Sequence, residues 1–149
     1  MSAALHLAGP DDGPKLLPMI AAFHTEFGLD ISDIQREEAL TPVLEGSPYA
    51  AAYIIGPRRS PVGYITVSFG WSMELGGLDG FVDEFFIRPS VRRRGMGTEV
   101  LLQLLPALGS AGVKALHMEV QKEDDSAKRL FHKAGFRARD GYVLMSRTF

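Results

Sequence analysis

The chain has 149 residues, of which 46% are hydrophobic and 23% are charged. This length fits one domain, and the composition is that of an ordinary globular protein, which excludes intrinsic disorder and a fold that depends on disulfides or metals. Because the sequence has no cysteine, it also excludes thiolate catalysis and metal sites built on cysteine. We expect a single domain over residues 1–149 in a reducing, cytoplasmic setting.

The charge is divided unevenly along the chain, although the net charge is only −2. Residues 1–50 carry two basic and eight acidic side chains, a net charge of −6, whereas residues 51–149 carry 14 basic and 10 acidic ones, a net charge of +4. If the charged side chains of each part lie close together in the fold, residues 1–50 attract cations and residues 51–149 attract anions. The alternative is that the acidic residues only cover solvent-exposed helix faces. The N-terminus has no basic start, and no run of eighteen apolar residues occurs, so we expect no signal peptide and no membrane span.

The first elements expected are a strand and a helix. Residues 5–7 favour a short strand, and Asp11 or Asp12 stands where the N-cap of a helix belongs. That helix should end at Gly28, a typical C-terminal cap. One face of it carries apolar side chains and a histidine at helical spacing: Leu16, Leu17, Ile20, Phe23, His24 and Phe27.

A second helix and three strands should follow. The segment 32–44 begins with the capping residues Ser and Asp and carries apolar side chains near its end. Residues 50–55 and 62–71 are rich in β-branched and aromatic side chains and are joined by a Gly/Pro-rich turn, which predicts a hairpin. Residues 81–87 form a third apolar run, which is stopped by Pro89.

The last third predicts two helices between strands. A helix begins near Gly97, residues 113–120 favour a strand, and residues 126–134 favour a helix. Two final strands, 136–139 and 142–148, flank the turn sequence Asp-Gly. The expected order is β-α-α-β-β-β-α-β-α-β-β, an α/β fold with a mixed sheet and helices on its faces.

A basic, glycine-containing turn connects the predicted strand 81–87 to the following helix. Three arginines precede the helix start, and glycines flank its first residues: Arg92, Arg93, Arg94, Gly95, Met96, Gly97 and Thr98. The unpaired N–H groups of a helix N-terminus bind anions, and glycine lets a bulky diphosphate approach the backbone. Neither a Walker loop nor a dinucleotide-binding Gly-x-Gly-x-x-Gly motif occurs.

The spacing Arg92-x-x-Gly95-x-Gly97 resembles the acetyl-CoA signature of the GNAT superfamily of N-acetyltransferases. A second segment agrees with it: family members usually carry Asn-x-x-Ala-x-x-Leu-Tyr-x-x-x-Gly-Phe, and the chain has Asp124, Ala127 and Phe131 at the corresponding first, fourth and eighth positions. The resemblance implies a GNAT-like fold and acetyl-CoA as co-substrate. It also implies that these residues and the signature line the acetyl-CoA site.

Two departures from the family pattern bear on the chemistry. Asp124 replaces asparagine, and Phe131 replaces the tyrosine that in many members protonates the leaving thiolate. The thiolate of a thiol with a pKa near 8.5 is a fair leaving group, so we expect no dedicated acid. Ser126, Tyr142 or water are the alternatives.

Attack of an amine on a thioester requires a base, because roughly one alkylamine molecule in a thousand is deprotonated at pH 7. Asp83 and Glu84 are the candidates. Strand alternation directs them to opposite faces unless a bulge intervenes. The segment 82–87 resembles the Leu-Glu-Asp-Phe-Phe-Val of spermidine/spermine N-acetyltransferases, which implies that Asp83 is the base and that Glu84 is a ligand of a polycation. We rank the two acids almost equally as candidates for the base.

The resemblance also implies that backbone groups around Phe86 and Ile87 bind pantetheine and polarise the thioester carbonyl. The four histidines show no metal-binding spacing, so we interpret them as packing or surface residues and expect no metal. A pI near 6.1 without a wider basic stripe argues against nucleic-acid binding. Dimers are common in the superfamily, so a homodimer stays open.

The sequence therefore predicts an N-acetyltransferase that moves an acetyl group from acetyl-CoA directly to a primary amine. The acidic first part of the chain favours a small cationic acceptor, such as a polyamine or an amino-acid-like amine. Two alternatives remain: a non-catalytic acyl-CoA sensor, and an acyltransferase that acts on a protein N-terminus or with a longer acyl chain.

Overall fold

The computed structural model describes residues 4–149, so residues 1–3, which belong to the segment where we expect no signal peptide, lie outside the described part. The chain divides into two compact units, of which the first ends at Glu119 and the second is Val120–Phe149. The expected single domain stays a prediction. None of the helices in the described part is both long and apolar enough to cross a membrane.

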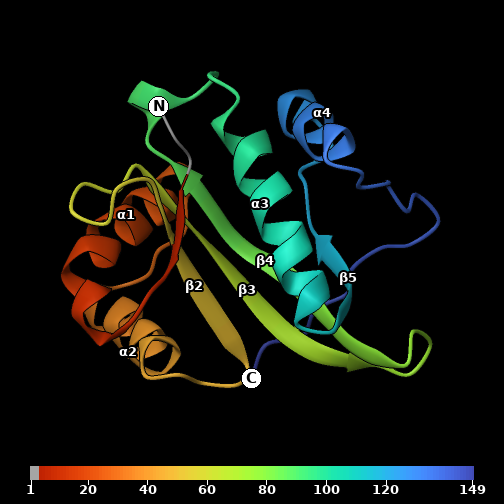
Figure 1. The fold of residues 1–149 in the computed structure, drawn as a ribbon, viewed down its shortest axis with the longest axis horizontal. Helices are drawn as coiled ribbons and strands as arrows, with labels where there is room; N and C mark the ends of the chain where they lie inside the picture. Colours follow the sequence, from red (N-terminus) through yellow and green to blue (C-terminus); the bar gives the residue numbers. More distant parts are fainter. Residues whose placement is uncertain (1–3) are drawn as a thin grey trace. The chain divides into compact units, whose positions relative to one another are not determined.

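The first unit is built on a five-stranded sheet whose strands lie in chain order (Figure 1). All neighbouring strands are antiparallel except the last two, which are parallel. The strands are β1 (Leu5–Leu7), β2 (Ala50–Ile55), β3 (Gly63–Ser72), β4 (Gly77–Ile87) and β5 (Val113–Met118). The parallel pair requires a crossover, and the helix between β4 and β5 supplies it.

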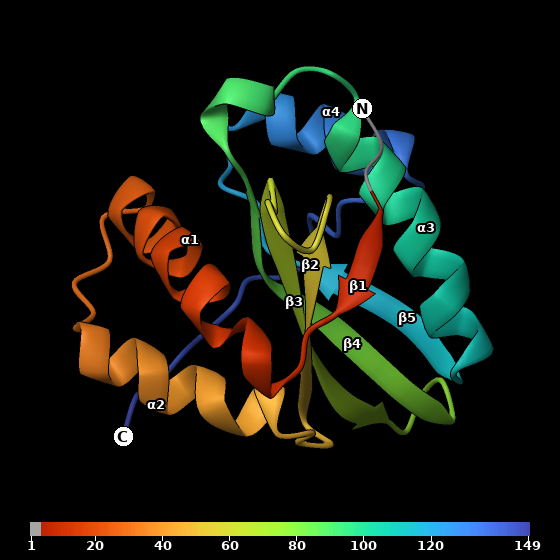
Figure 2. The same ribbon diagram turned by 60° about the vertical axis from the view of Figure 1, so that its left-hand side comes forward.

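Helices cover both faces of this sheet, as Figure 2 shows: α1 and α2 lie on one side and α3 on the other. The bounds are α1 (Gly13–Glu26), α2 (Asp33–Leu44) and α3 (Met96–Ser110), with short 3-10 turns η1 (Pro10–Asp12) and η2 (Pro89–Val91). The α/β class with a mixed sheet is therefore confirmed.

Apolar side chains at helical spacing bury each helix. On one face, Leu16 and Ile20 of α1 and Leu40 of α2 pack in one cluster with Tyr64 and Phe86 of the sheet. Helix α3 buries its own apolar row, Val100, Leu101, Leu104 and Leu108. Full burial of one such side chain stabilises the fold by about 1.5 to 3 kcal/mol. These two apolar layers therefore fix how the helices lie on the strands.

Local signals explain most element ends. Ser32 caps α2, since its hydroxyl accepts a hydrogen bond from the backbone N–H of Gln35, whose side chain accepts one from the N–H of Ser32. Strand β4 begins at Gly77, four residues before the expected Phe81, because Gly77–Gly80 pair with the end of β3. Strands β3 and β4 are thus joined by a short turn that closes at Gly76, whose φ is +69°.

The second unit contains α4 (Asp125–Lys133), which ends before Gly135 at φ +96°. The two strands expected at 136–139 and 142–148 are not formed, and this part of the prediction is wrong. The turn itself exists, because the N–H of Tyr142 donates to the carbonyl of Arg139 at 3.3 Å. However, a strand needs a partner for its backbone groups, and within the described residues the two segments pair neither with each other nor with another strand.

Candidate active site

A β-bulge lies in β4 at the two candidate bases. Thr66 pairs with Glu84 and its neighbour Val67 pairs with Val82, which leaves Asp83 as an extra residue without a partner in β3. The backbone N–H of Glu84 donates to the side-chain hydroxyl of Thr66 at 3.0 Å. The bulge interrupts the alternation of β4, so the expectation that Asp83 and Glu84 face opposite ways does not apply here.

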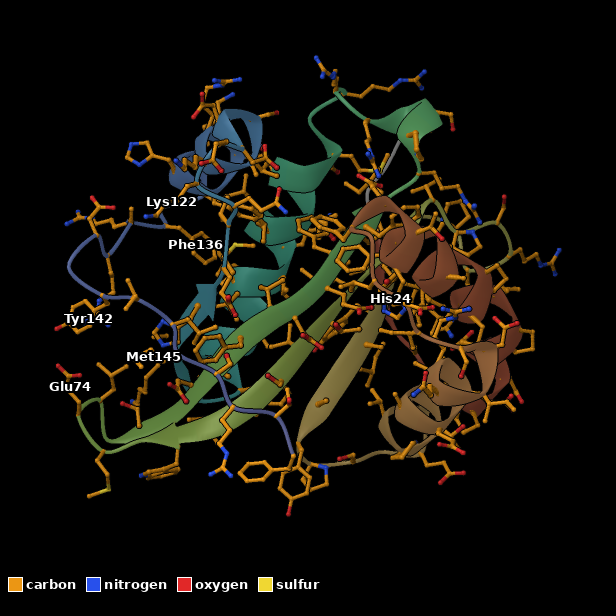
Figure 3. The ribbon with its side chains drawn as sticks, turned by 180° about the vertical axis from the view of Figure 1, so that it is seen from behind. His24, Glu74, Lys122, Phe136, Tyr142 and Met145 are labelled. Carbon is orange, nitrogen blue, oxygen red and sulfur yellow. The ribbon has the colours of Figure 1, made fainter. Side chains whose placement is uncertain are left out.

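Glu84 is held by side chains from two other elements. The Tyr64 hydroxyl of β3 donates to Oε1 at 2.8 Å. Nε2 of His24, on α1, lies 2.7 Å from Oε2. Tyr64 and His24 are buried, and the Glu84 side chain is 19% exposed. Figure 3 shows His24 reaching from α1 towards the sheet. Three elements therefore meet at one carboxylate.

Asp83 stands beside this group with an exposed side chain. Protein atoms that replace part of its solvent raise the pKa of the Asp83 carboxyl, the negative charge of Glu84 raises it further, and that of Glu119 adds a smaller increase; His24 lowers it. Burial and the charge of Glu84 also raise the pKa of Tyr64 far above its ordinary value, so its hydroxyl keeps its proton. An exposed carboxylate with a raised pKa is suited to accept a proton.

Neither His24 nor Tyr64 was predicted from the sequence as a site residue. His24 belongs to the apolar face of α1, where it follows Leu16 and Ile20 at four-residue intervals, and we interpreted it as a packing or surface residue. It is 5% exposed, yet it makes a polar contact. A single polar ring in an apolar stripe that faces an acidic strand was the signal that could have found it.

The carboxyl end of β4 has one open edge. Strand β5 pairs with β4 from Leu78 to Val82 and ends at Met118, so in the described residues the stretch after Val82 has no β5 partner. The N–H groups of Glu84 and Arg88 point to the β3 side, where they meet Thr66 and Val62. By alternation, the backbone N–H of Ile87 points to the open side, and the backbone groups of Phe86 point to β3.

The turn after β4 presents backbone N–H groups at the start of α3. Arg93 at φ +64° and Gly95 at φ +77° adopt the left-handed conformation, and no side chain caps the helix that begins at Met96. The first intrahelical bond runs from the N–H of Glu99 to the carbonyl of Gly95. The N–H groups of residues 96–98 therefore have the geometry that binds anions. These residues fit the diphosphate that the sequence motif implies.

The three arginines of the turn differ in their partners. Arg92 makes a two-pronged ion pair with Glu26 at the end of α1, at 3.0 and 2.6 Å. Its Nε donates to the Ile87 carbonyl at 2.6 Å, and its guanidinium lies 5.5 Å from the centre of the Phe86 ring. The side chains of Arg93 and Arg94 are exposed. Arg92 thus ties the turn to α1, and its two neighbours offer their charge to solvent.

The remaining predicted residues belong to the second unit. Asp124 caps α4, because its Oδ1 accepts a hydrogen bond from the N–H of Ala127 at 3.0 Å. Phe131 is buried, and its ring packs edge-on against Phe136 with ring centres 5.7 Å apart. No group of three or more acidic or histidine side chains in residues 4–149 is arranged to hold a metal ion.

Comparison with known proteins identifies the family. Residues 19–136 match the model of the acetyltransferase (GNAT) family, which is most of the chain, so this protein belongs to that family. A search of curated proteins finds no match to the sequence. The chain is a GNAT-type N-acetyltransferase, and acetyl-CoA is the acetyl donor that the family generally uses.

Solved structures agree with the fold. An integron cassette protein from the mobile metagenome of Cole Harbour Salt Marsh is 31% identical, with 97% of this chain and 89% of that one covered and a TM-score of 0.83. A putative acetyltransferase from Arthrobacter sp. FB24 is 25% identical, with 98% and 94% covered and a TM-score of 0.79. An aminoglycoside acetyltransferase from an uncultured soil metagenomic sample, in complex with sisomicin, is 17% identical, with 98% and 95% covered and a TM-score of 0.80; it shows the shared fold.

Proposed function

We propose that this N-acetyltransferase moves an acetyl group from acetyl-CoA directly to the primary amine of a small cationic acceptor, with Asp83 as the base. The observation that carries the proposal is the bulge in β4. It leaves an exposed Asp83 next to Glu84, whose carboxylate is held at both oxygens. Asp83 is therefore available to the acceptor, and Glu84 is held in place next to Asp83.

In the proposed reaction, Asp83 takes the proton that the ammonium group of the acceptor must lose. The nitrogen then forms a bond to the acetyl carbonyl carbon, the bond from that carbon to sulfur breaks, and the sulfur leaves as a thiolate. The raised pKa of Asp83 makes it a better proton acceptor than an ordinary aspartate. With no cysteine in the chain, a direct transfer is simpler than one through a covalent enzyme intermediate.

Glu84 has a different role in this proposal. Its two oxygens already accept hydrogen bonds from Tyr64 and His24, so it stays in place while the acceptor binds. Its negative charge attracts an ammonium group and raises the pKa of Asp83. We therefore propose that Glu84 binds the acceptor and tunes the base, and of the two candidate bases we favour Asp83.

Acetyl-CoA would bind along the turn and the open edge of β4. The N–H groups of Met96, Gly97 and Thr98 would bind the diphosphate, with Arg93 and Arg94 adding positive charge. The backbone N–H of Ile87 on the open side would bind the pantetheine arm, since the carbonyl of Ile87 already accepts a hydrogen bond from Arg92. The family pattern adds Gly95 to this site, and it keeps Asp124, Ala127 and Phe131 of the second unit as predicted acetyl-CoA residues. Since Phe131 has no proton to give, the thiolate leaves without a dedicated acid.

The charge of the site favours a cationic acceptor. Three carboxylates act on one another there, because Glu84 and Glu119 both raise the pKa of Asp83. An ammonium group is attracted by such a field. The resemblance of residues 82–87 to the spermidine/spermine branch points the same way, towards a polyamine or an amino-acid-like amine.

The test is an amine panel with acetyl-CoA, in which released thiol is measured. The panel should include polyamines, amino acids and peptides with free N-termini. We expect thiol release with small cationic amines and a loss of kcat of about 10²-fold or more in Asp83→Asn, the usual contribution of a general base. Acetyl-CoA binding should be unchanged in that variant. Full activity of Asp83→Asn would overturn the base assignment.

A second candidate function rests on Phe131. Without a tyrosine at this position, a non-catalytic acyl-CoA sensor would bind acetyl-CoA and release no thiol with any amine. Binding without turnover across the whole panel would therefore favour the sensor. Turnover of peptides alone, or with a longer acyl-CoA alone, would instead favour the alternative acyl transfers.

A further inference from the structure

We propose that His24 is a positioning residue of the acetyl transfer, which holds Glu84 in place from α1 so that Asp83 can act as the base. The proposal rests on the function proposed above, because it assumes that Asp83 accepts the proton. It concerns a residue sixty positions away from Glu84 in the sequence. The motifs of the acetyl-CoA site do not include it.

Glu84 is fixed by three separate hydrogen bonds, two at its carboxylate and one at its backbone N–H. Oε2 is 2.7 Å from His24 Nε2, Oε1 is 2.8 Å from the Tyr64 hydroxyl, and the backbone N–H donates to the Thr66 hydroxyl at 3.0 Å. Tyr64 and Thr66 both come from β3, so they hold Glu84 within the sheet. His24 is the partner that connects it to α1 and therefore sets where the helix and the carboxylate meet.

The ring of His24 is itself held by aromatic contacts. It lies edge-on to Phe23, with ring centres 6.0 Å apart, and Phe23 in turn lies edge-on to Tyr64 at 6.4 Å. His24 is 5% exposed. A ring packed in this way has few alternative orientations, so its Nε2 directs a hydrogen bond to a fixed point.

The two ring nitrogens of His24 have different environments. To donate to a carboxylate, Nε2 must carry a proton. Nδ1 is buried without a hydrogen-bond partner. His24 is thus a donor to Glu84 and has no free, accessible nitrogen with which to act as a base.

His24 also affects the base that it does not touch. The charged groups that shift the pKa of Asp83 come from two elements and from the end of a third: Glu84 on β4, His24 on α1 and Glu119 after β5. Glu84 and Glu119 raise the pKa of Asp83, whereas His24 lowers it. Loss of His24 should therefore raise this pKa and also leave the Glu84 carboxylate with one donor fewer.

The experiment compares three substitutions of His24. In His24→Gln the side-chain amide nitrogen can reach the position of Nε2, whereas in His24→Asn it reaches only the position of Nδ1, and His24→Leu has no donor. Each variant is measured for kcat, acceptor KM and acetyl-CoA affinity between pH 5 and pH 9, a range chosen around the usual pKa of histidine. The acceptor's own pKa is the same in every assay, so a shift between variants reports on the enzyme.

We expect kcat to fall about tenfold or more in the asparagine and leucine variants, as a misplaced catalytic group typically causes, with acetyl-CoA affinity unchanged. The acidic limb of kcat should move to higher pH in all three variants, because none of them carries the charge through which His24 lowers the pKa of Asp83, whereas His24→Gln should restore most of the activity at the plateau. Equal losses in the glutamine and asparagine variants without a shift of the limb would overturn the proposal, because packing alone would then explain them.

The outcome for Asp83→Asn separates the two proposals. If Asp83→Asn is fully active, the base assignment fails whatever His24 does. If Asp83→Asn is inactive while His24→Leu keeps the wild-type kcat and pH profile, only the positioning role fails. Should His24→Leu not fold, the contrast between the glutamine and asparagine variants still tests the positioning role, since both replace the buried ring of His24 by an amide side chain.

Discussion

Nε2 of His24 lies 2.7 Å from Oε2 of Glu84, and this contact joins helix α1 to the bulged strand β4. A second connection between the same two parts of the fold lies nearby in the chain, where Glu26 at the end of α1 holds Arg92 after β4. Helix α1 is thus attached both to the carboxylate beside the proposed base and to the turn that would bind the diphosphate. Substitutions on α1 can therefore change both halves of the reaction.

Glu84→Gln should move the acidic limb of kcat to lower pH. The charge of Glu84 raises the pKa of Asp83, so a neutral amide at this position removes that contribution, and Asp83 stays deprotonated further into acid. The direction is opposite to that expected for His24→Leu, which makes the pair a test of sign. The measurement is kcat against pH for each variant. A limb that moves the same way in both would contradict the arrangement of charges described here.

Glu84→Gln should also weaken acceptor binding. The lost charge attracts an ammonium group, so KM for a cationic amine should rise several-fold, as expected for one partly buried charge, while acetyl-CoA affinity changes little. A neutral amine of similar size in the same assay provides the control. Equal increases in KM for both amines would argue against charge-guided capture of the acceptor.

Asp83→Asn should stabilise the folded protein at neutral pH. A carboxyl whose pKa is raised in the folded state binds its proton more tightly there than in the unfolded chain. Its contribution to stability is therefore greatest below the unfolded pKa and is lost as the pH rises through the folded pKa. Melting temperatures of the wild type and Asp83→Asn at pH 7 and pH 4 test this. The variant should melt higher at pH 7, and the difference should shrink at pH 4.

Local patterns in the sequence were sufficient for most of the fold. Strand 50–55 and helix α2 were predicted because their signals, β-branched residues in one and a capping pair at Ser32 in the other, act over a few residues. The final strands were predicted from the same kind of signal and are not formed. The Asp-Gly turn between them is a local feature, whereas a strand exists only where another backbone pairs with it.

The site was only half predictable for a related reason. The glycines and arginines of the turn and the two acids of β4 are contiguous in the sequence, so they could be recognised together. The bulge depends on how β3 pairs with β4 around Thr66, and the contact between His24 and Glu84 spans sixty positions. Neither follows from spacing along one segment, and both decide which acid is exposed.

Gly95→Ala should weaken acetyl-CoA binding, and Gly109→Ala is its matched control. Gly95 has φ +77°, and a Cβ there would meet no atom within 4 Å, so the cost arises from the backbone conformation alone. That cost is about 1 to 2 kcal/mol for an L-residue. Gly109 lies inside α3 with equally open surroundings, and alanine there should stabilise the helix by up to about 1 kcal/mol.

The measurements are melting temperature and acetyl-CoA affinity for both variants. We expect Gly95→Ala to lose affinity, because a turn that relaxes from the left-handed conformation moves the N–H groups of Met96 to Thr98 that would bind the diphosphate. Gly109→Ala should keep the wild-type affinity and melt slightly higher. If both variants bound acetyl-CoA as tightly as the wild type, the start of α3 would not be the diphosphate site.

Salt should affect the acceptor more than acetyl-CoA. The acceptor would be attracted by exposed carboxylates such as Asp83 and Glu119, whose field is screened over about 8 to 10 Å at ordinary ionic strength. The diphosphate would be bound mainly by direct hydrogen bonds from backbone N–H groups, which salt weakens less. Raising the salt concentration should thus increase acceptor KM more than it increases the dissociation constant of acetyl-CoA. Equal sensitivity of the two would mean that the exposed Arg93 and Arg94 dominate coenzyme binding, and Arg93→Ala or Arg94→Ala would then reduce the salt dependence.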